Sequence, residues 1–167
     1  MTARLWASVT TLTEAAQIDG FRCDRESVHN WLHEKALAAR PNVQTLLYLD
    51  DEGRPVAFAA TTMAIVTVAD GTSAQRAGSR EGQSVGFMLA QMGVHSERAD
   101  GGIGRAIVKD VMEAAVRAHA EGPFPLFVVD AAEEALVGYY EGLGLRRLAD
   151  GLRLATPMRS ILRIVSE

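Results

Sequence analysis

The sequence has 167 residues, of which 48% are hydrophobic and 23% charged, and its formal net charge at pH 7 is −4. This composition excludes an intrinsically disordered chain, and the acidic balance gives no global electrostatic argument for nucleic-acid binding. No apolar run approaches the roughly 20 residues that span a bilayer. Residues 1–8 lack the pattern of a signal peptide, and the single cysteine excludes an internal disulfide. We therefore expect one domain over residues 1–167, located in the cytoplasm and without a membrane partner.

The first half of the chain is expected to form a helix and a β-hairpin. Apolar side chains recur with a helical period after Asp24, the expected N-cap, and Pro41 ends the pattern. Two β-prone segments on either side of an acidic turn with a glycine predict the hairpin. A polar segment without periodicity follows, either as a long surface loop or as an insertion in a hairpin. The expected elements are a strand at 3–10, the helix at 24–40, strands at 45–49 and 54–68, and the polar segment at 69–84.

The second half is expected to alternate strands with helices. Apolar runs predict the strands, and the 3.6-residue period of residues 103–121 predicts a long amphipathic helix. The whole chain therefore indicates an α/β protein with a mixed sheet and helices on its faces, without the regular βαβαβ order of a dinucleotide-binding fold. The expected elements are a strand at 85–94, the helix at 103–121, a strand at 124–129, a short helix at 130–140, and strands at 145–148 and 158–165 linked by a turn near 150–151.

The most informative stretch is residues 98–105, between the expected strand 85–94 and the helix 103–121. Three glycines in four positions leave backbone N–H groups uncovered at a helix start, where the helix dipole favours an anion. Arg98 and Arg105 flank the turn and add positive charge. These features predict a phosphate-binding turn; the alternative is a tight loop whose glycines only supply positive φ angles. The stretch has neither GxGxxG spacing nor the Gly-Lys-Ser/Thr of a P-loop.

Together with the order of elements, two motifs make the sequence resemble the GNAT family of acetyl-CoA-dependent N-acetyltransferases. In that family, Gln/Arg-x-x-Gly-x-Gly/Ala joins the fourth strand to the helix that binds the CoA pyrophosphate. Here the pattern falls on residues 99–104, where Gly102 and Gly104 match, Ala99 replaces the Gln or Arg, and Arg98 stands one place too early. The resemblance implies a backbone cradle for the pyrophosphate, in which the usual side-chain interaction is missing or comes from another residue.

The second motif, residues 129–145, resembles the family's strand-helix segment ending in aromatic-Tyr-x-x-x-Gly-Phe. Tyr140 and Gly144 fall on the tyrosine and the glycine, and Leu145 replaces the Phe. With the first motif, this extends the resemblance over residues 21–165. It implies a single-domain GNAT-like fold with a mixed central sheet of about seven strands, flanked by about four helices and splayed between strands 4 and 5.

The resemblance also implies a cosubstrate and the residues that hold it. Acetyl-CoA would donate the acetyl group, and no metal would be required. Strand 85–94 would pair with the pantetheine arm, and a backbone N–H near Met92 or Val94 would bond the thioester carbonyl like an oxyanion hole. The expected cofactor-binding residues are Met92, Gly93, Val94, Arg98, Gly101, Gly102, Ile103, Gly104 and Arg105.

Tyr140 is the candidate catalytic acid, because a phenol can hydrogen-bond to the thiolate that leaves during acetyl transfer. The alternative is that Tyr139 and Tyr140 are core aromatic residues. Strand 85–94 contains no carboxylate that could act as a base, so His95, Glu97 and water are the candidates.

The remaining candidates for chemistry are expected to be structural or solvated. His29 and His33 have the i, i+4 spacing of a metal-binding pair, but no third ligand accompanies them. Cys23 is expected to be an inert, buried side chain, because nothing nearby in the sequence supplies a base.

Three functions follow from the resemblance. The first is acetyl transfer to the amine of a small molecule or peptide, with the acceptor unidentified. The second is that of the GNAT toxins of bacterial toxin–antitoxin modules, which acetylate aminoacyl-tRNA; Phe21-x-Cys23, the Trp31 helix and residues 129–131 resemble them, whereas the acidic charge and the 69–84 segment depart from them. The third is a non-catalytic acyl-CoA-binding module. Under the second function the partners would be tRNA and an antitoxin, and a homodimer is compatible with all three.

Overall fold

The computed structural model describes residues 5–149 and 151–167. The described residues form two compact units: unit 1 comprises those within Met1–Thr61 and Gln91–Val108, and unit 2 those within Thr62–Ala90 and Lys109–Glu167. The first two residues of the expected strand at 3–10, and position 150 of the expected turn at 150–151, lie outside the described residues.

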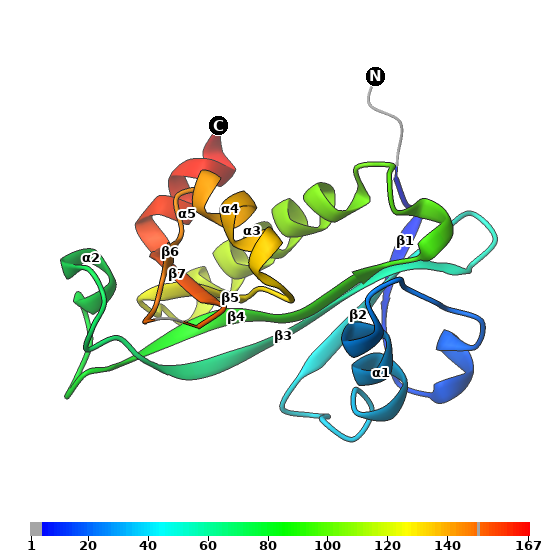
Figure 1. Ribbon diagram of the computed structural model, residues 1–167, viewed down its shortest axis with the longest axis horizontal. Helices are drawn as coiled ribbons and strands as arrows, with labels where there is room; N and C mark the ends of the chain where they lie inside the picture. Colours follow the sequence, from blue (N-terminus) through cyan, green and yellow to red (C-terminus); the bar gives the residue numbers. More distant parts are fainter. Residues whose placement is uncertain (1–4, 150) are drawn as a thin grey trace. The chain divides into compact units, whose positions relative to one another are not determined.

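The described residues form an α/β fold with a seven-stranded mixed sheet, which confirms the predicted fold class (Figure 1). The strand order is β1-β2-β3-β4-β5-β7-β6, with β4 and β5 parallel. None of the described helices is long and apolar enough to cross a membrane. The strands are β1 (Ser8–Thr11), β2 (Gln44–Leu49), β3 (Pro55–Thr67), β4 (Gln83–Val94), β5 (Leu126–Asp130), β6 (Arg146–Arg147) and β7 (Arg153–Pro157). The helices are α1 (Glu26–Glu34), α2 (Ser73–Arg76), α3 (Ile103–Glu121), α4 (Glu134–Gly142) and α5 (Met158–Ser166), with 3-10 turns η1 (Ala15–Ile18) and η2 (Ser96–Arg98).

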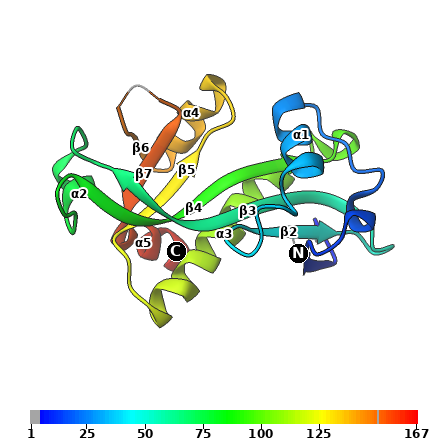
Figure 2. The same cartoon turned by 90° about the horizontal axis from the view of Figure 1, so that it is seen from below.

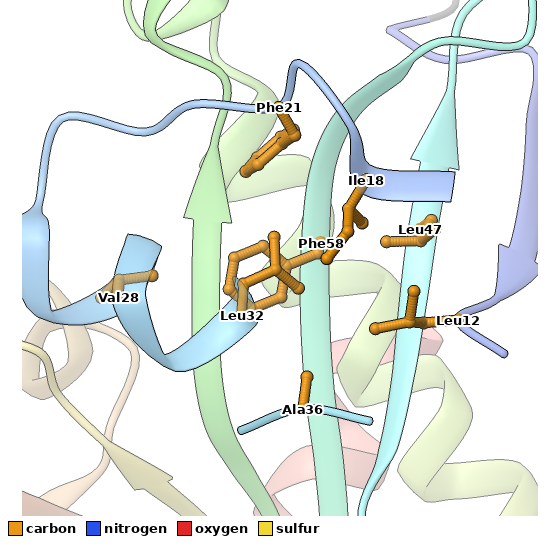
Figure 3. Packing of buried hydrophobic residues seen from close by; sticks show 8 residues of the cluster. All are labelled: Leu12, Ile18, Phe21, Val28, Leu32, Ala36, Leu47 and Phe58. Atoms are coloured by element: carbon orange, nitrogen blue, oxygen red, sulfur yellow. The ribbon is translucent and has the colours of Figure 1, made fainter. Parts of the chain in front are cut away.

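Unit 1 is held together by one apolar cluster around Phe58 of β3 (Figure 3). Val28 and Leu32 are four residues apart on α1, so both side chains face the cluster. Phe21 meets Phe58 edge to face, with 5.9 Å between the ring centroids. Removal of this surface from water stabilises the unit by about 1.5–3 kcal/mol for each large side chain. The cluster contains Leu12, Ile18, Phe21, Val28, Leu32, Ala36, Leu47 and Phe58.

Helix α1 is shorter than the predicted 24–40. Its N-cap is Arg25, not Asp24, and it ends at Glu34. The N–H groups of Lys35 and Ala36 both donate to the carbonyl of Trp31, at 2.9 and 3.0 Å, and this ends the regular hydrogen-bond pattern. A run of turns carries the chain on to β2.

The polar segment at 69–84 is an ordered insertion in a hairpin. It joins β3 to β4 and contains α2, which lies at the end of this hairpin (Figure 2). Thr72 and Gln75 form a capping box, a local sequence signal of a helix start that hydrophobic periodicity does not reveal. Gln75 is 1% exposed and donates from Nε2 to the carbonyls of Arg146 at 2.9 Å and Ala155 at 3.2 Å. The segment is therefore fixed to β6 and β7.

The expected strand at 158–165 is wrong, because these residues form helix α5. Met158 and Ile161 are buried three residues apart, whereas Arg159 and Arg163, four residues apart, are not buried. This is the period of an amphipathic helix, and the β-branched residues of the segment concealed it. The last two strands are β6 and β7, and α5 packs against β5 and β7.

The parallel ladder between β4 and β5 is short. It pairs Gly86 with Leu126 and ends where Leu89 pairs with Val129. β5 ends one residue later, whereas β4 continues to Val94. The expected separation of the two strands beyond this ladder stays a prediction.

Candidate functional site

The turn predicted to bind phosphate leads directly into α3. Gly102 has φ +79° and Ile103 is the first residue of the 19-residue helix. Within residues 5–149 and 151–167, the N–H groups of Gly102, Ile103 and Gly104 have no hydrogen-bond acceptor. These donors lie at the positive end of the helix dipole. The turn therefore has the donors and the local charge that an anion requires.

The residues predicted on β4 lie next to this helix start. A Cβ atom added to Gly104 would lie 3.9 Å from Met92 Cε and 3.9 Å from Val94 Cγ2. The structure thus brings Met92 and Val94 together with Gly104 in unit 1. The space at Gly104 would accept a methyl group, but a long side chain would have to extend beyond it.

Gly93 meets the core of unit 1. A Cβ atom there would lie 2.8 Å from Phe58 Cε1, 3.0 Å from Val28 Cγ1 and 3.2 Å from Cys23 Sγ. The structural reason for a glycine at this position is close packing of α1 and β3 against β4. Only the backbone of Gly93 is left for the cofactor contact predicted from the sequence.

Arg98 interacts with the hairpin turn of unit 1. Its Nη2 atom lies 3.7 Å from Oδ2 of Asp50, between β2 and β3. Asp50 Oδ1 accepts from the backbone N–H groups of Glu52 and Arg54, both at 2.9 Å. The Arg54 bond is the main cause that lowers the pKa of the Asp50 carboxyl. Arg98 thus has a partner that sequence reasoning missed, while Arg105 lies in the first turn of α3.

A cavity of about 320 Å³ lies beside the same turn. Arg98, Gly101 and Ile103 contribute to its wall, together with Glu97 and Asp100. The two acidic groups oppose the binding of an anion there. The orphan N–H groups of residues 102–104 are therefore the stronger anion-binding feature.

Tyr140 is on α4 in unit 2 and is 4% exposed. Its ring meets Tyr139 edge to face, with 5.2 Å between centroids. The carbonyl of Tyr140 accepts from the N–H groups of Leu143 at 3.1 Å and Leu145 at 3.2 Å, which closes the helix end. The predicted motif is thus a helix with a fixed C-terminus followed by β6, and the acid role of Tyr140 remains a prediction.

His95 is poorly suited to act as a base through Nδ1. This atom accepts from the Glu97 N–H at 3.2 Å, so the hydrogen of a neutral ring is assigned to Nε2. His33 Nε2 donates to the carbonyl of Phe21 at 2.9 Å, and the ring centroids of His29 and His33 are 4.4 Å apart. Among the described residues, no group of three or more His, Cys, Asp or Glu side chains could hold a metal ion.

Two further ion pairs in unit 2 were not predicted. Arg153 donates to both carboxylate oxygens of Asp130, from Nε at 2.7 Å and from Nη2 at 2.9 Å, and this raises the pKa of the guanidinium. Arg147 pairs with Glu134 and lowers the pKa of that carboxyl. The C-terminal arginines 147 and 153 are thus held by acids from the β5–α4 region. The register of β5 and β7 places Asp130 opposite Arg153, whereas Glu134 reaches Arg147 from the start of α4, and neither pairing is visible in the sequence alone.

Comparison with known proteins supports the fold. The sequence matches no model of a known protein family, and no curated protein matches it. The structure is similar to a Tyr-to-Phe mutant of KacT, with 17% identity and a TM-score of 0.80 over 94% of this chain and 98% of that one. It is also similar to AtaT in complex with acetyl-methionyl-tRNAfMet, with 15% identity and a TM-score of 0.79 over 94% and 98% of the two chains.

A third similar structure is a Tyr-to-Phe mutant of the AtaT toxin bound to acetyl-CoA and the C-terminus of the antitoxin AtaR. It shares 15% identity with this chain and has a TM-score of 0.76 over 96% and 98% of the two chains. At these identities the likeness establishes the fold. It confirms the fold, a mixed sheet flanked by helices, that the sequence and its resemblance predicted.

Proposed function

We propose that this protein is an acetyl-CoA-dependent N-acetyltransferase. The observation that carries the proposal is the set of three N–H groups, on Gly102, Ile103 and Gly104, without acceptors among the described residues at the start of a long helix. These donors would hold the CoA pyrophosphate, while Met92 and Val94 would lie along the pantetheine arm. Acetyl-CoA in complex with the structurally similar AtaT supports this choice of cosubstrate.

The chemistry assigned to the chain is simple. The acceptor nitrogen forms a bond to the acetyl carbonyl carbon, the carbon–sulfur bond breaks, and the nitrogen loses one proton to water. Tyr140 supplies a hydrogen bond or a proton to the departing thiolate, and proton exchange with solvent restores the phenol. The similar structures of KacT and AtaT include Tyr-to-Phe mutants, and this supports the choice of a tyrosine hydroxyl as the group to test.

The direct test is calorimetry with acetyl-CoA. Wild-type protein should bind it, and Gly104→Glu should not, because a carboxylate would enter the anion site beside Met92 and Val94. Gly104→Ala is the matched control, since its methyl group makes only ordinary contacts at 3.9 Å. Gly138→Glu adds the same charge to an open position of α4 and should leave binding unchanged. No binding by the folded wild type would overturn the proposal.

The second candidate is a toxin that acetylates aminoacyl-tRNA. The observation that favours it is the likeness to AtaT in complex with acetyl-methionyl-tRNAfMet. It predicts growth arrest when the chain is expressed in bacteria, relief of the arrest by Tyr140→Phe, and acetylated aminoacyl-tRNA in extracts. Normal growth with abundant active protein would count against it. Binding of acetyl-CoA without transfer to any amine would instead support a non-catalytic module.

A further inference from the structure

A second cavity, of about 220 Å³, lies within unit 2 and belongs to no part of the site described above. One wall comes from the end of β3 and the start of the insertion that follows it, and the other from β7 and the turn before it. The lining residues are Thr67, Asp70, Gly71, Leu148, Ala149 and Arg153. Its volume suits a small molecule, not a folded partner.

The two walls are held together by Gln75. Its Nε2 donors reach the carbonyls of Arg146 and Ala155, and its Oε1 accepts from the Thr72 N–H at 2.9 Å. A Cβ atom on Gly71 would lie 2.6 Å from Gln75 Oε1, so the chain there fits closely around this amide. The buried side chain thus fixes the acidic wall relative to β6 and β7.

The arginine in the opposite wall is fixed too. Asp130 binds Arg153 through Nε and Nη2, which leaves Nη1 without a partner among the described residues. Because Asp130 balances the charge of this guanidinium, Arg153 can serve as a positioned donor without attracting anions strongly. An uncharged oxygen, such as an amide carbonyl, is the matching acceptor.

Asp70 provides the remaining charge. Among the described residues its carboxylate has no ion-pair or hydrogen-bond partner, and it is the only acidic side chain in the lining. With Arg153 and Asp130 balanced, the described lining residues carry one uncompensated negative charge. Leu148 and Ala149, in the same wall as Arg153, add apolar contact.

We propose that this cavity binds a small primary ammonium compound with a neighbouring carbonyl oxygen, the ammonium group at Asp70 and the oxygen at Arg153. The binding is independent of acetyl-CoA and of the proposed transfer, so it can be tested without either. The apolar contact favours a ligand with a short aliphatic side chain.

Three probes of similar size separate the contributions of the ammonium group and the carbonyl oxygen to binding. Leucinamide has both groups, isopentylamine lacks the amide, and 4-methylpentanamide lacks the ammonium group. NMR titration of the full chain should rank leucinamide first, with the other two at least about tenfold weaker because each loses one charged or oriented hydrogen bond. The largest chemical-shift changes should occur at Asp70, Gly71 and Leu148. Equal affinity for leucinamide and 4-methylpentanamide, or changes elsewhere only, would overturn the proposal.

Variants separate the two walls. Asp70→Asn keeps the shape of the side chain and should remove the preference for leucinamide over 4-methylpentanamide. Asp51→Asn, which neutralises an exposed carboxylate of unit 1, is the control and should leave this preference intact. Arg153→Lys keeps a cation for Asp130 but has no free planar donor, so it should remove the preference for leucinamide over isopentylamine. Unfolding midpoints of each variant report on the fold. Full leucinamide affinity in folded Asp70→Asn would contradict the assignment.

Discussion

Arg98 and Asp50 lie next to each other, with 3.7 Å between Nη2 and Oδ2, although 48 positions separate them in the sequence. The contact ties η2, which precedes the glycine turn, to the turn between β2 and β3. Arg98 is the residue that stands one place before the motif position occupied by Ala99. Its guanidinium is therefore engaged by an acid of unit 1, and the backbone of residues 102–104 remains the main anion-binding feature.

The Asp50 carboxyl should give the stability of unit 1 a specific pH dependence. Backbone bonds from Arg54 and Glu52 lower its pKa in the folded state, so the unfolded chain binds a proton at this site more readily. The contribution is full above the ordinary aspartate pKa of about 4 and is lost as the pH falls through the lower folded value. Urea unfolding from pH 7 downward should show wild type and Asp50→Asn converging in acid. The free energy of unfolding of the Asp51→Asn variant should follow that of the wild type. A difference in this free energy between wild type and Asp50→Asn that does not change with pH would refute the assignment.

Gly93→Ala should destabilise unit 1 by about 1–3 kcal/mol, because a methyl group has to displace a packed core. The closest atom, Phe58 Cε1, would be 2.8 Å from the new Cβ. Gly104→Ala should cost much less, since its Cβ would have 3.9 Å to its neighbours. Urea unfolding followed by circular dichroism measures both changes. Equal losses for the two variants would show that backbone entropy, not packing, decides the effect.

The success of sequence reasoning depended on how local each signal was. The strand, the glycine turn and the long helix around residues 85–121 carry their own periods and turn residues, so their positions could be predicted. The link between Gln75 and β6 and β7 could not, because it joins positions more than 70 residues apart. The same holds for Arg153 and Asp130, which the register of β5 and β7 brings together.

In the C-terminal segment, the strand propensity of single residues and the spacing of the apolar residues predict different structures, and the spacing is the correct signal. Isoleucine and valine in residues 161–165 favour a strand, yet Met158 and Ile161 alternate with arginines at helical spacing. Packing against β5 and β7 selects the helix, since it buries both side chains on one face.

The loss of stability caused by a substitution in α5 should therefore depend on whether the residue lies on the buried or the exposed face of the helix. Ile161 is fully buried, and Ile161→Ala should cost about 2–5 kcal/mol through reduced burial and a cavity. Leu162 is 39% exposed, and Leu162→Ala should cost at most about 0.5 kcal/mol. Chemical unfolding of the two variants measures the difference. Similar losses of stability at both positions would contradict the burial of the Ile161 face of α5 against the sheet.

Tyr140→Phe tests the acid role with the smallest change. Only the hydroxyl is removed, so the ring of this buried residue should still pack beside Tyr139. If the phenol assists the leaving thiolate, kcat should fall by about 10²-fold or more, while the acetyl-CoA Kd measured by calorimetry stays within a factor of about 2. Tyr139→Phe is the matched control and should retain activity. A folded Tyr140→Phe protein with wild-type kcat would assign the proton to water and leave Tyr140 a core residue.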